Sequence, residues 1–410
     1  MLSRTGGERR KEARFSVSRL RKSAILSLFV GHLPEEKSMQ RRDFIKTAGV
    51  AALAAGGLSG CKEQECAEPG ALPVGKPTQR YRWRMVTTWP KGFPGLGTAA
   101  ERLAELVAEM SGGRLTIEVL GAGELVPAFE VFDAVARGTA QMGHGSAYYW
   151  RSKTETGQFF STVPFGLTAQ EMTSWILHGG GMELWRELYQ PFGIVPMIAG
   201  NTGVQMGGWF NKEIRQIEDL QGLKMRIPGL GGEVLRRAGG VPVNLPGAEL
   251  FTSLQTGVID AAEWVGPYND LAFGIYRAAK YYYYPGFHEP GTVVEALINR
   301  AALEALPADL QSIVLNSCKV VNQELLSEYT ARNPLALETL LNEHQVELRR
   351  YPDAVLQHLR RLSAEVVADL GAKDPLSGRI YQSYQEFMAH ARKWSALSEL
   401  AYLNARDRIQ

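Results

Sequence analysis

The feature that most constrains the fold is a regular alternation of strand-like and helix-like segments, which begins at Tyr81. YRWRMVTTW is typical of a buried strand, GTAAERLAELVAEM of an amphipathic helix and RLTIEVLGAG of a second strand. AFEVFDAVARGTA predicts another helix, and AQMGHGSAYYW predicts a short strand that runs into a loop. Because such strand–helix–strand connections join parallel neighbours, the alternation predicts a parallel α/β sheet.

A second cycle of the same kind follows GIVPMIAGNTGVQMGGWFN. It predicts a strand at Lys224–Pro228, a helix after the glycine turn and another strand ending at Asn244. GAELFTSLQTGVIDAAEW then repeats the helix, glycine stop and short strand of the first cycle. Beyond Leu303 the pattern is nearly all helical, as far as WSALSELAYLNARDRI. The sequence therefore predicts two α/β lobes and a long helical C-terminal region.

The first 61 residues comprise an N-terminal extension and, from Met39 to Cys61, a segment that is typical of an export signal and not of a folded domain. Arg41 and Arg42 precede Phe-Ile-Lys and a run of small apolar residues, an arrangement similar to a twin-arginine signal. LSGC, which ends at Cys61, resembles a lipobox whose cysteine becomes lipidated. The apolar run is too short and too rich in glycine and alanine to span about 30 Å of hydrocarbon comfortably. We therefore expect a periplasmic protein, and whether Cys61 anchors it to lipid stays open.

The segments on either side of this signal are also unlike a packed domain. Residues 1–38 carry the basic cluster RRKEAR and no pattern that favours order, so translation can start at Met1 or at Met39. Residues 62–78 are rich in proline and glycine and predict a flexible tether. The net charge of +2 comes from well-mixed acids and bases, which argues against nucleic acid as a partner.

Motifs for catalysis are weak. GLGTAA, residues 95–100, matches Gly-x-Gly-x-x-Ala, the fingerprint of dinucleotide-binding sites. The next strand lacks the acidic residue that would bind the ribose of such a cofactor, so the match is weak. The sequence contains no nucleophile elbow, His-Glu-x-x-His helix, phosphate loop or Cys-x-x-Cys pair. His144 and His288 have no second histidine at ligand spacing, so we expect them to be structural or exposed. A metal-dependent lyase or hydrolase built on acidic residues is the enzyme alternative.

Two polar residues lie where a ligand of an α/β sheet would bind. Arg226 comes just before Ile227-Pro228, and ligands bind at the carboxyl ends of strands, where an arginine can fork onto a carboxylate. A solvated arginine at a sheet edge is the alternative. Gln205 lies in a strand-like run between two glycine-bearing turns and could contact the same anion, or could simply belong to a connecting strand.

Two glutamates lie at similar strand-to-loop transitions. Glu263 precedes Trp264 in AAEWVGP, and Glu289 lies in GFHEPG. Hard cations take carboxylate and carbonyl oxygens, so two glutamates and a backbone carbonyl would suit Na⁺ or Ca²⁺. Two separate surface ion pairs are the alternative.

Together, the twin-arginine start, GELVPAFEVFDAVARGTAQMGHG, DLQGLKMRIPGLGGEVLRRAGGVPV and ELFTSLQTGVIDAAEW resemble the extracytoplasmic solute receptors of tripartite ATP-independent periplasmic (TRAP) transporters. The resemblance extends from about Tyr81 to the last helices. GNTGVQMGGWF, AAEWVGPYND and YYYYPGFHEPG are similar to the subgroup that binds 2-oxoacids or related monocarboxylates with a metal ion. The resemblance implies a two-lobe periplasmic binding protein that delivers such an acid to a membrane permease.

The resemblance also implies residue roles. Arg226 would hold the ligand carboxylate and Gln205 would contact the ligand. Glu263 would supply a carboxylate, and Trp264 a backbone carbonyl, to a cation that Glu289 completes. The bound acid would coordinate the same cation, so that a cation would satisfy Glu263.

Further expectations concern the cleft, the lobes and the assembly. Tyr148 and Tyr149 could line the cleft. Lobe I would comprise residues 79–203 and 292–330, and lobe II residues 204–291 and 331–410. The C-terminal helix FMAHARKWSALSELAYLNARDRI could form a homodimer. A larger dicarboxylate or sugar acid would need a second cationic group, for which Lys91 and Arg151 are the candidates.

Overall fold

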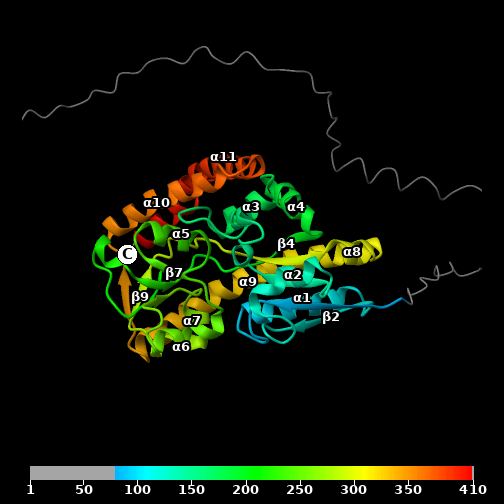
Figure 1. The fold of residues 1–410 in the computed structure, drawn as a ribbon, viewed down its shortest axis with the longest axis horizontal. Coiled ribbons are helices and arrows are strands. Elements are labelled where there is room, and N and C mark those ends of the chain that lie inside the picture. Colours follow the sequence, from blue (N-terminus) through cyan, green and yellow to red (C-terminus); the bar gives the residue numbers. More distant parts are fainter. Residues whose placement is uncertain (1–78, 409–410) are drawn as a thin grey trace, which may run out of the picture. The chain divides into compact units, whose positions relative to one another are not determined.

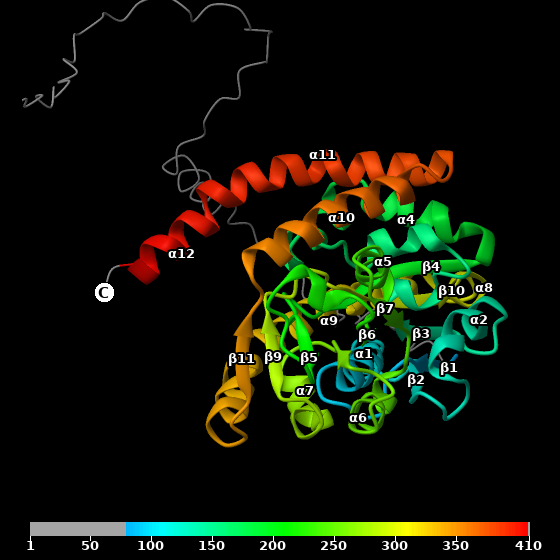
Figure 2. The ribbon, with the colours of Figure 1, turned by 60° about the vertical axis from the view of Figure 1, so that its left-hand side comes forward.

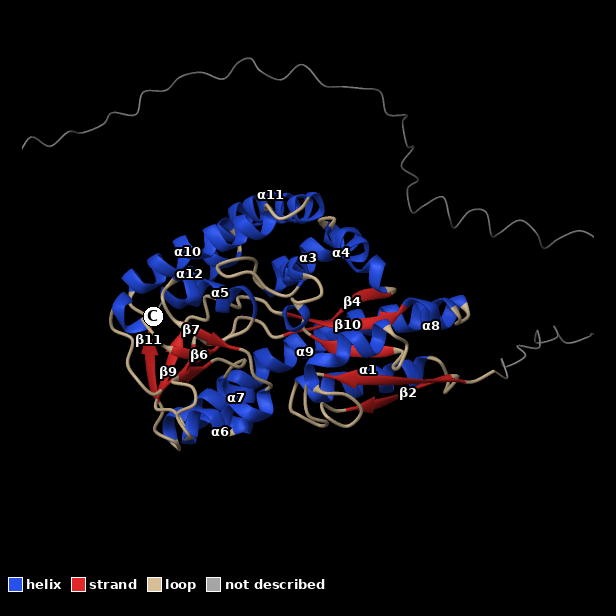
Figure 3. Cartoon of the chain, viewed as in Figure 1, coloured by secondary structure: helices blue, strands red, loops and turns tan. Residues whose placement is uncertain are grey.

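The computed structural model describes residues 79–408, which form the elements seen in Figure 1 and Figure 3. The export signal, the lipobox at Cys61, the tether and the two candidate start residues lie outside the described residues. None of the helices in the described part combines the length and the apolar character needed to cross a membrane.

The first sheet has five strands in the order β2-β1-β3-β10-β4. β1 is parallel to β2 and β3, as the strand–helix alternation predicted, whereas β10 is antiparallel to β3 and β4. The prediction of a parallel sheet is therefore wrong for this part, because a strand from much later in the chain enters between β3 and β4. The strands are β1 (Tyr81–Thr87), β2 (Leu115–Leu120), β3 (Met142–Gly145), β4 (Ile194–Asn201) and β10 (Val293–Asn299).

Helices pack against this sheet through their apolar faces. α1 contacts β2 and α9, α2 contacts β3, and α9 contacts β4. The amphipathic pattern of α1 places Leu103 and Val107 fully inside this core. The helices are α1 (Leu96–Met110), α2 (Val131–Ala136), α3 (Ala169–His178), α4 (Gly181–Tyr189), α8 (Arg300–Glu304) and α9 (Ala308–Asn342).

The glycine motif before α1 has a packing explanation. Gly95 adopts φ 72°, and a Cβ there would lie 2.7 Å from the hydroxyl oxygen of Tyr329 in α9. Only glycine combines this backbone conformation with such a close approach. The motif therefore serves the contact between α1 and α9, which accounts for its glycine without a dinucleotide.

The second sheet has six strands in the order β11-β9-β5-β8-β6-β7. β6 is parallel to β7 and β8, while β5 is antiparallel to β8 and β9. The strands are β5 (Gly208–Phe210), β6 (Lys224–Arg226), β7 (Val241–Val243), β8 (Ala261–Ala262), β9 (Tyr281–Tyr284) and β11 (Glu347–Arg350). The helices of this region are α5 (Gly229–Arg237), α6 (Leu250–Gln255), α7 (Pro267–Phe273) and α10 (Asp353–Gly371).

The C-terminal helices follow the second sheet. α10 packs on α5, while α11 (Pro375–Leu397) contacts α3 and α4. The expected long terminal helix breaks at Ser398, after which α12 (Glu399–Arg408) extends beyond the sheets (Figure 2). Several large apolar side chains around this break are exposed: Trp394, Leu397, Leu400, Tyr402 and Leu403.

Candidate functional site

The predicted site residues lie at the ends of strands and in the loops that follow them. Arg226 ends β6, Glu263 and Trp264 follow β8, and Glu289 follows β9. Gln205 lies in the loop between β4 and β5, and Tyr148 and Tyr149 lie in the 3-10 turn η2 (Ala147–Trp150) after β3. All seven side chains are buried, with exposed fractions of at most 8%.

Arg226 is the central cation of the site. Its Nε donates to the Leu245 carbonyl (3.1 Å), and Nη1 donates to the Glu263 carbonyl (2.9 Å) and pairs with the Glu263 carboxylate. Nη2 donates to the Tyr149 hydroxyl (3.3 Å), and the guanidinium carbon lies 5.1 Å from the centroid of the Trp264 ring. A solvated edge arginine is therefore the wrong interpretation, since the side chain is 1% exposed.

The charge of Arg226 is held in place by its neighbours. Burial is the largest effect and works against the charged guanidinium, but the Glu263 carboxylate, Tyr149 and Tyr148 together outweigh it, and the pKa of Arg226 is raised. A buried ion pair of this kind is costly to break from one side, because the remaining charge would be left uncompensated.

Glu263 is satisfied on both carboxylate oxygens. Arg226 pairs with Oε1, and the Nε2 atom of His288 lies 3.2 Å from Oε2. Its backbone N–H donates to the carbonyl of Arg226 (3.0 Å), which ties the β8 loop to the end of β6. In this structure Glu263 is therefore satisfied by protein groups, and the interpretation as a surface ion pair is wrong because both partners are buried.

Glu289 is bound by neutral donors. Its Oε2 accepts hydrogen bonds from Gln205 Nε2 (2.8 Å) and Thr292 Oγ1 (2.5 Å). Burial, followed by the nearby charge of Glu263, raises the pKa of Glu289 well above its usual value, against the lowering effects of Thr292 and Arg226. The other amide atom of Gln205, Oε1, is buried without a hydrogen-bond partner in the described structure. The carboxyl group of Glu289 and the amide oxygen of Gln205 therefore both have lone pairs available to bind a cation.

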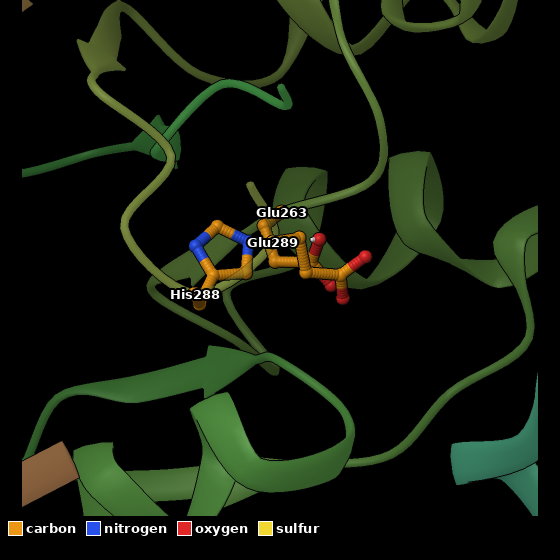
Figure 4. Close-up of side chains that lie close together, drawn as sticks. All are labelled: Glu263, His288 and Glu289. Carbon is orange, nitrogen blue, oxygen red and sulfur yellow. Dashed lines mark hydrogen bonds and ion pairs between the residues drawn. The ribbon is translucent and has the colours of Figure 1, made fainter. Parts of the chain in front are cut away.

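Three side chains could hold a metal ion (Figure 4). One ligand atom each from Glu263, His288 and Glu289 lies within 4.8 Å of the others. Sequence reasoning missed His288, because a lone histidine without a partner at ligand spacing gives no metal signal. Its position next to Glu289 in GFHEPG was the one available hint. The Trp264 carbonyl as a cation ligand stays a prediction.

The two tyrosines come from the opposite side of the site. The hydroxyl of Tyr149 accepts a hydrogen bond from Arg226. Tyr148 lies against Gly229 at the start of α5, so closely that a Cβ added to Gly229 would be 3.1 Å from the Cβ of Tyr148. Residues next to the first sheet therefore touch residues of the second sheet at Arg226. Lys91 and Arg151, the candidates for a second cation, are exposed.

Asp270 is a supporting residue that sequence reasoning did not identify. Its Oδ2 accepts from Trp209 Nε1 (2.9 Å) and Tyr282 Oη (2.7 Å), and Oδ1 accepts from the backbone N–H of Val265 (3.3 Å). Burial raises the pKa of Asp270 to about 6. Because Val265 follows Trp264 directly, Asp270 fixes the loop that carries Glu263 and Trp264.

Comparison with known proteins gives a consistent result. A sequence profile of the bacterial extracellular solute-binding protein family 7 matches residues 85–374. A monocarboxylate 2-oxoacid-binding periplasmic protein of Nostoc sp. (strain PCC 7120) is 40% identical over 366 residues, which cover 89% of this chain and 98% of the relative.

Two solved structures are also similar. A TRAP periplasmic solute-binding protein from Pseudoalteromonas atlantica with bound sodium and pyruvate is 44% identical, with a TM-score of 0.78 over 80% of this chain and 99% of that chain. One from Colwellia psychrerythraea with bound calcium and pyruvate is 42% identical, also with a TM-score of 0.78, over 80% of this chain and 100% of that chain.

Proposed function

The chain belongs to family 7 of the bacterial extracellular solute-binding proteins, the DctP-type receptors of TRAP transporters, and we propose that its buried site binds a small 2-oxoacid such as pyruvate together with Na⁺ or Ca²⁺. Members of this family are transport receptors and not enzymes, so the lyase or hydrolase alternative does not apply. The observation that carries the proposal is the fully buried Arg226 beside two buried glutamates.

The number of carboxylates on the bound acid is limited by the number of buried cationic side chains. Arg226 is the only lysine or arginine that is buried among residues 79–407. One guanidinium can neutralise one carboxylate, and a second carboxylate in the same site would be left as an uncompensated buried charge. A monocarboxylate is therefore favoured over a dicarboxylate, and its keto oxygen would be the second group that faces the cation.

The contacts of Arg226 suggest how the cation and the acid depend on each other. Nε and one Nη1 hydrogen are used by backbone carbonyls, and the second Nη1 hydrogen is used by the Glu263 carboxylate. A carboxylate ligand that takes the guanidinium fork must compete with Glu263 for Nη1. A cation bound to Glu263 weakens this competition, so cation and acid would favour each other's binding.

The remaining roles complete the proposal. Gln205, Trp264, Tyr148 and Tyr149 would contact the acid, while Glu263, Glu289 and the Trp264 carbonyl would bind the cation. The burial of all these side chains around Arg226 supports this assignment. The lobes would divide as expected from the sequence, with the acid between them, and the receptor would deliver it to TRAP permease subunits.

Export and assembly are also proposed. The twin-arginine motif at Arg41–Arg42 would direct the chain to the periplasm, where lipidation of Cys61 would hold it at the membrane. The exposed apolar side chains of α11 and α12 support a homodimer formed through the C-terminal helices.

A titration tests the binding proposal. The exported chain, freed of ligand by unfolding and refolding, is titrated with pyruvate and with a dicarboxylate, each with Na⁺, with Ca²⁺ and with neither, and tryptophan fluorescence is recorded. Trp264 lies over Arg226, so we expect saturable quenching by pyruvate that strengthens with the cation. Binding of the dicarboxylate in preference to pyruvate, or no response to either acid, would contradict the proposal.

A further inference from the structure

We propose that Phe93, in the loop between β1 and α1, is a positioning residue of the acid-binding site, where its ring holds the indole of Trp264 over Arg226. The inference rests on the proposed function in so far as Trp264 contacts the acid. Phe93 comes from the first sheet's side of the molecule, whereas Arg226 ends a strand of the second sheet and Trp264 follows another. Acid binding would therefore depend on a loop that sequence reasoning did not connect with the site.

The indole of Trp264 is oriented by packing and not by a hydrogen bond. Its side chain is buried, and Nε1 has no hydrogen-bond partner within the described part of the chain. The guanidinium carbon of Arg226 lies 5.1 Å from the ring centroid, and a Cβ at Gly247 would lie 2.5 Å from Cη2 of the indole. Because a buried tryptophan N–H usually has a partner, this one is available to an oxygen of the bound acid as long as the ring keeps its orientation.

Phe93 supplies ring contacts that fix this orientation. Its centroid lies 6.3 Å from that of Trp264, with the rings edge-on at 77°, and 4.2 Å from that of Phe273, with the rings nearly parallel at 26°. Phe273 in turn meets Trp264 edge-on, with centroids 5.3 Å apart. Each aromatic pair favours its own geometry, so three mutually packed rings resist the rotation of any one of them. Since Phe93 is buried, a smaller side chain there would leave a cavity beside the indole.

The backbone that carries Phe93 is held by α7 and α9. Asn269 of α7 donates through Nδ2 to the carbonyl of Pro94 (2.8 Å). The hydroxyl of Tyr329 in α9 donates to Oδ1 of the same asparagine (2.6 Å). Asn269 and Tyr329 are both buried, so water does not compete for these hydrogen bonds and the loop is fixed at the residue that follows Phe93.

Consecutive residues of α7 hold the two loops that meet at these rings. Asn269 binds the loop of Phe93, and Asp270 accepts a hydrogen bond from the backbone N–H of Val265, which follows Trp264. Hydrogen bonds therefore fix the backbone of both loops, while ring contacts fix the indole. The backbone carbonyl of Trp264, the predicted cation ligand, does not depend on Phe93. Loss of the Phe93 ring should accordingly weaken acid binding more than cation binding.

Calorimetry separates this role from the simpler alternative that Phe93 only fills space between α1 and α7. The exported protein is titrated with Ca²⁺ alone and with pyruvate at saturating Ca²⁺. We expect Phe93→Ala to weaken pyruvate binding at least about fivefold and Phe93→Leu, which refills most of the space, to recover part of this loss. The affinity for Ca²⁺ alone should stay within about twofold. Equal losses for acid and cation, or unchanged pyruvate binding in Phe93→Ala, would overturn the inference.

The matched control is Phe192→Ala. Phe192 is also a partly enclosed ring, packed edge-on against Phe132 with centroids 5.0 Å apart, but it lies beside β4 and contacts none of the site residues. Pyruvate affinity in this variant should stay within about twofold of wild type. A loss as large as that of Phe93→Ala would mean that removing any such ring weakens binding, which would overturn the specific role of Phe93.

The orientation of the indole can also be followed without a ligand. In protein labelled with ¹⁵N in tryptophan, nuclear magnetic resonance resolves the indole N–H signals, and Trp264→Phe identifies that of Trp264 by its loss. In Phe93→Ala this signal should shift or broaden, while that of Trp185 in α4, assigned in the same way, stays in place. An unchanged Trp264 signal in a variant that has lost pyruvate affinity would overturn the positioning role.

This measurement distinguishes failure of the inference from failure of the proposed function. If wild type does not bind pyruvate with Ca²⁺, the proposed function fails, yet a shifted Trp264 signal in Phe93→Ala would still support the positioning role of Phe93.

Discussion

At the scale of single residues, the site depends on which partner Glu263 takes. In the present structure its carboxylate lies between Arg226 and His288. The same carboxylate would be a cation ligand in the proposed complex, so the ion pair and the complex exclude each other at Oε1. This exchange leads to two predictions about side-chain chemistry.

The first concerns the guanidinium fork. Arg226→Lys keeps a positive charge beside Glu263 but loses the two parallel N–H donors that a carboxylate accepts. We expect the affinity for pyruvate to fall by roughly ten- to a hundredfold, because one charge-assisted hydrogen bond contributes about 1.5–3 kcal/mol. Arg151→Lys, a change at an exposed arginine, is the control, and calorimetry is the measurement. Unchanged affinity in Arg226→Lys would refute the role of Arg226.

The second concerns coupling. Glu263→Gln removes the charge that competes for Arg226 and also removes a cation ligand. We expect pyruvate binding by this variant to become insensitive to Na⁺ and Ca²⁺, with a change of less than about twofold, whereas coupled sites typically show at least about fivefold. Glu295→Gln is a buried control whose carboxyl is bonded to Trp150 and Tyr189. If Glu263→Gln keeps the cation dependence of wild type, the exchange does not operate.

At the scale of elements, loops between strands hold the site, and the first sheet is the base from which η2 brings Tyr148 and Tyr149 to it. His144 in β3 connects three parts of this base, since Trp89 Nε1 donates to its Nδ1 (2.9 Å) and its Nε2 lies 3.1 Å from the Ala199 carbonyl in β4. The first bond requires Nδ1 without hydrogen, so the ring is neutral and Nε2 donates. Burial lowers the pKa of His144 to about 4.

This histidine predicts a loss of stability in acid. The pKa of His144 is lower in the folded state than the ordinary value of 6.5, so the unfolded chain binds the proton first as the pH falls. The stabilisation by neutral His144 is complete above pH 6.5 and is lost between pH 6.5 and 4, by up to about 3 kcal/mol.

His144→Asn removes this titration. We expect the difference in unfolding free energy between wild type and the variant to shrink as the pH is lowered from 7 to 4, in urea denaturation followed by circular dichroism. His390→Asn, a change at an exposed site on α11, should show the wild-type pH dependence. A pH-independent difference for His144→Asn would mean that His144 does not carry the effect.

At the scale of the whole molecule, the C-terminal helices α11 and α12 carry apolar side chains that the rest of the described chain leaves exposed. Leu397 is 79% exposed and Leu400 is 56% exposed, on either side of the break at Ser398. Apolar surface of this kind favours a partner surface, which the proposed homodimer would supply from a second copy of the chain.

The prediction is that Leu397→Asp with Leu400→Asp gives a monomer in light scattering at concentrations where wild type is a dimer. Pyruvate affinity should stay within about twofold, because every described site residue belongs to one chain and binding and association are then independent. Leu335→Asp, at a leucine of α9 that is 58% exposed, is the control. A wild-type monomer, or a dimeric double variant, would contradict the proposed interface.

Some of this protein was determined by sequence alone. The two strand–helix cycles and the helical C-terminal region follow from hydrophobic periodicity, which is a local property of the chain. The carboxyl ends of strands are local as well, so Arg226, Glu263 and Glu289 could be named as candidate ligand residues from their positions at or after predicted strands, beside the alternatives of a solvated arginine and surface ion pairs. Their individual roles came from the resemblance to a family and not from pattern.

Only the tertiary structure decided which of these groups meet. The antiparallel entry of β10, the pairing of Glu263 with Arg226 and the approach of His288 to Glu263 all join segments that are far apart in the chain. Periodicity says which face of an element is buried, but it contains no information about which loop lies across from another. The partner of a buried charge is therefore set by the strand order of the second sheet and by the loops that follow its strands, and this is why His288 became visible as a candidate ligand only in three dimensions.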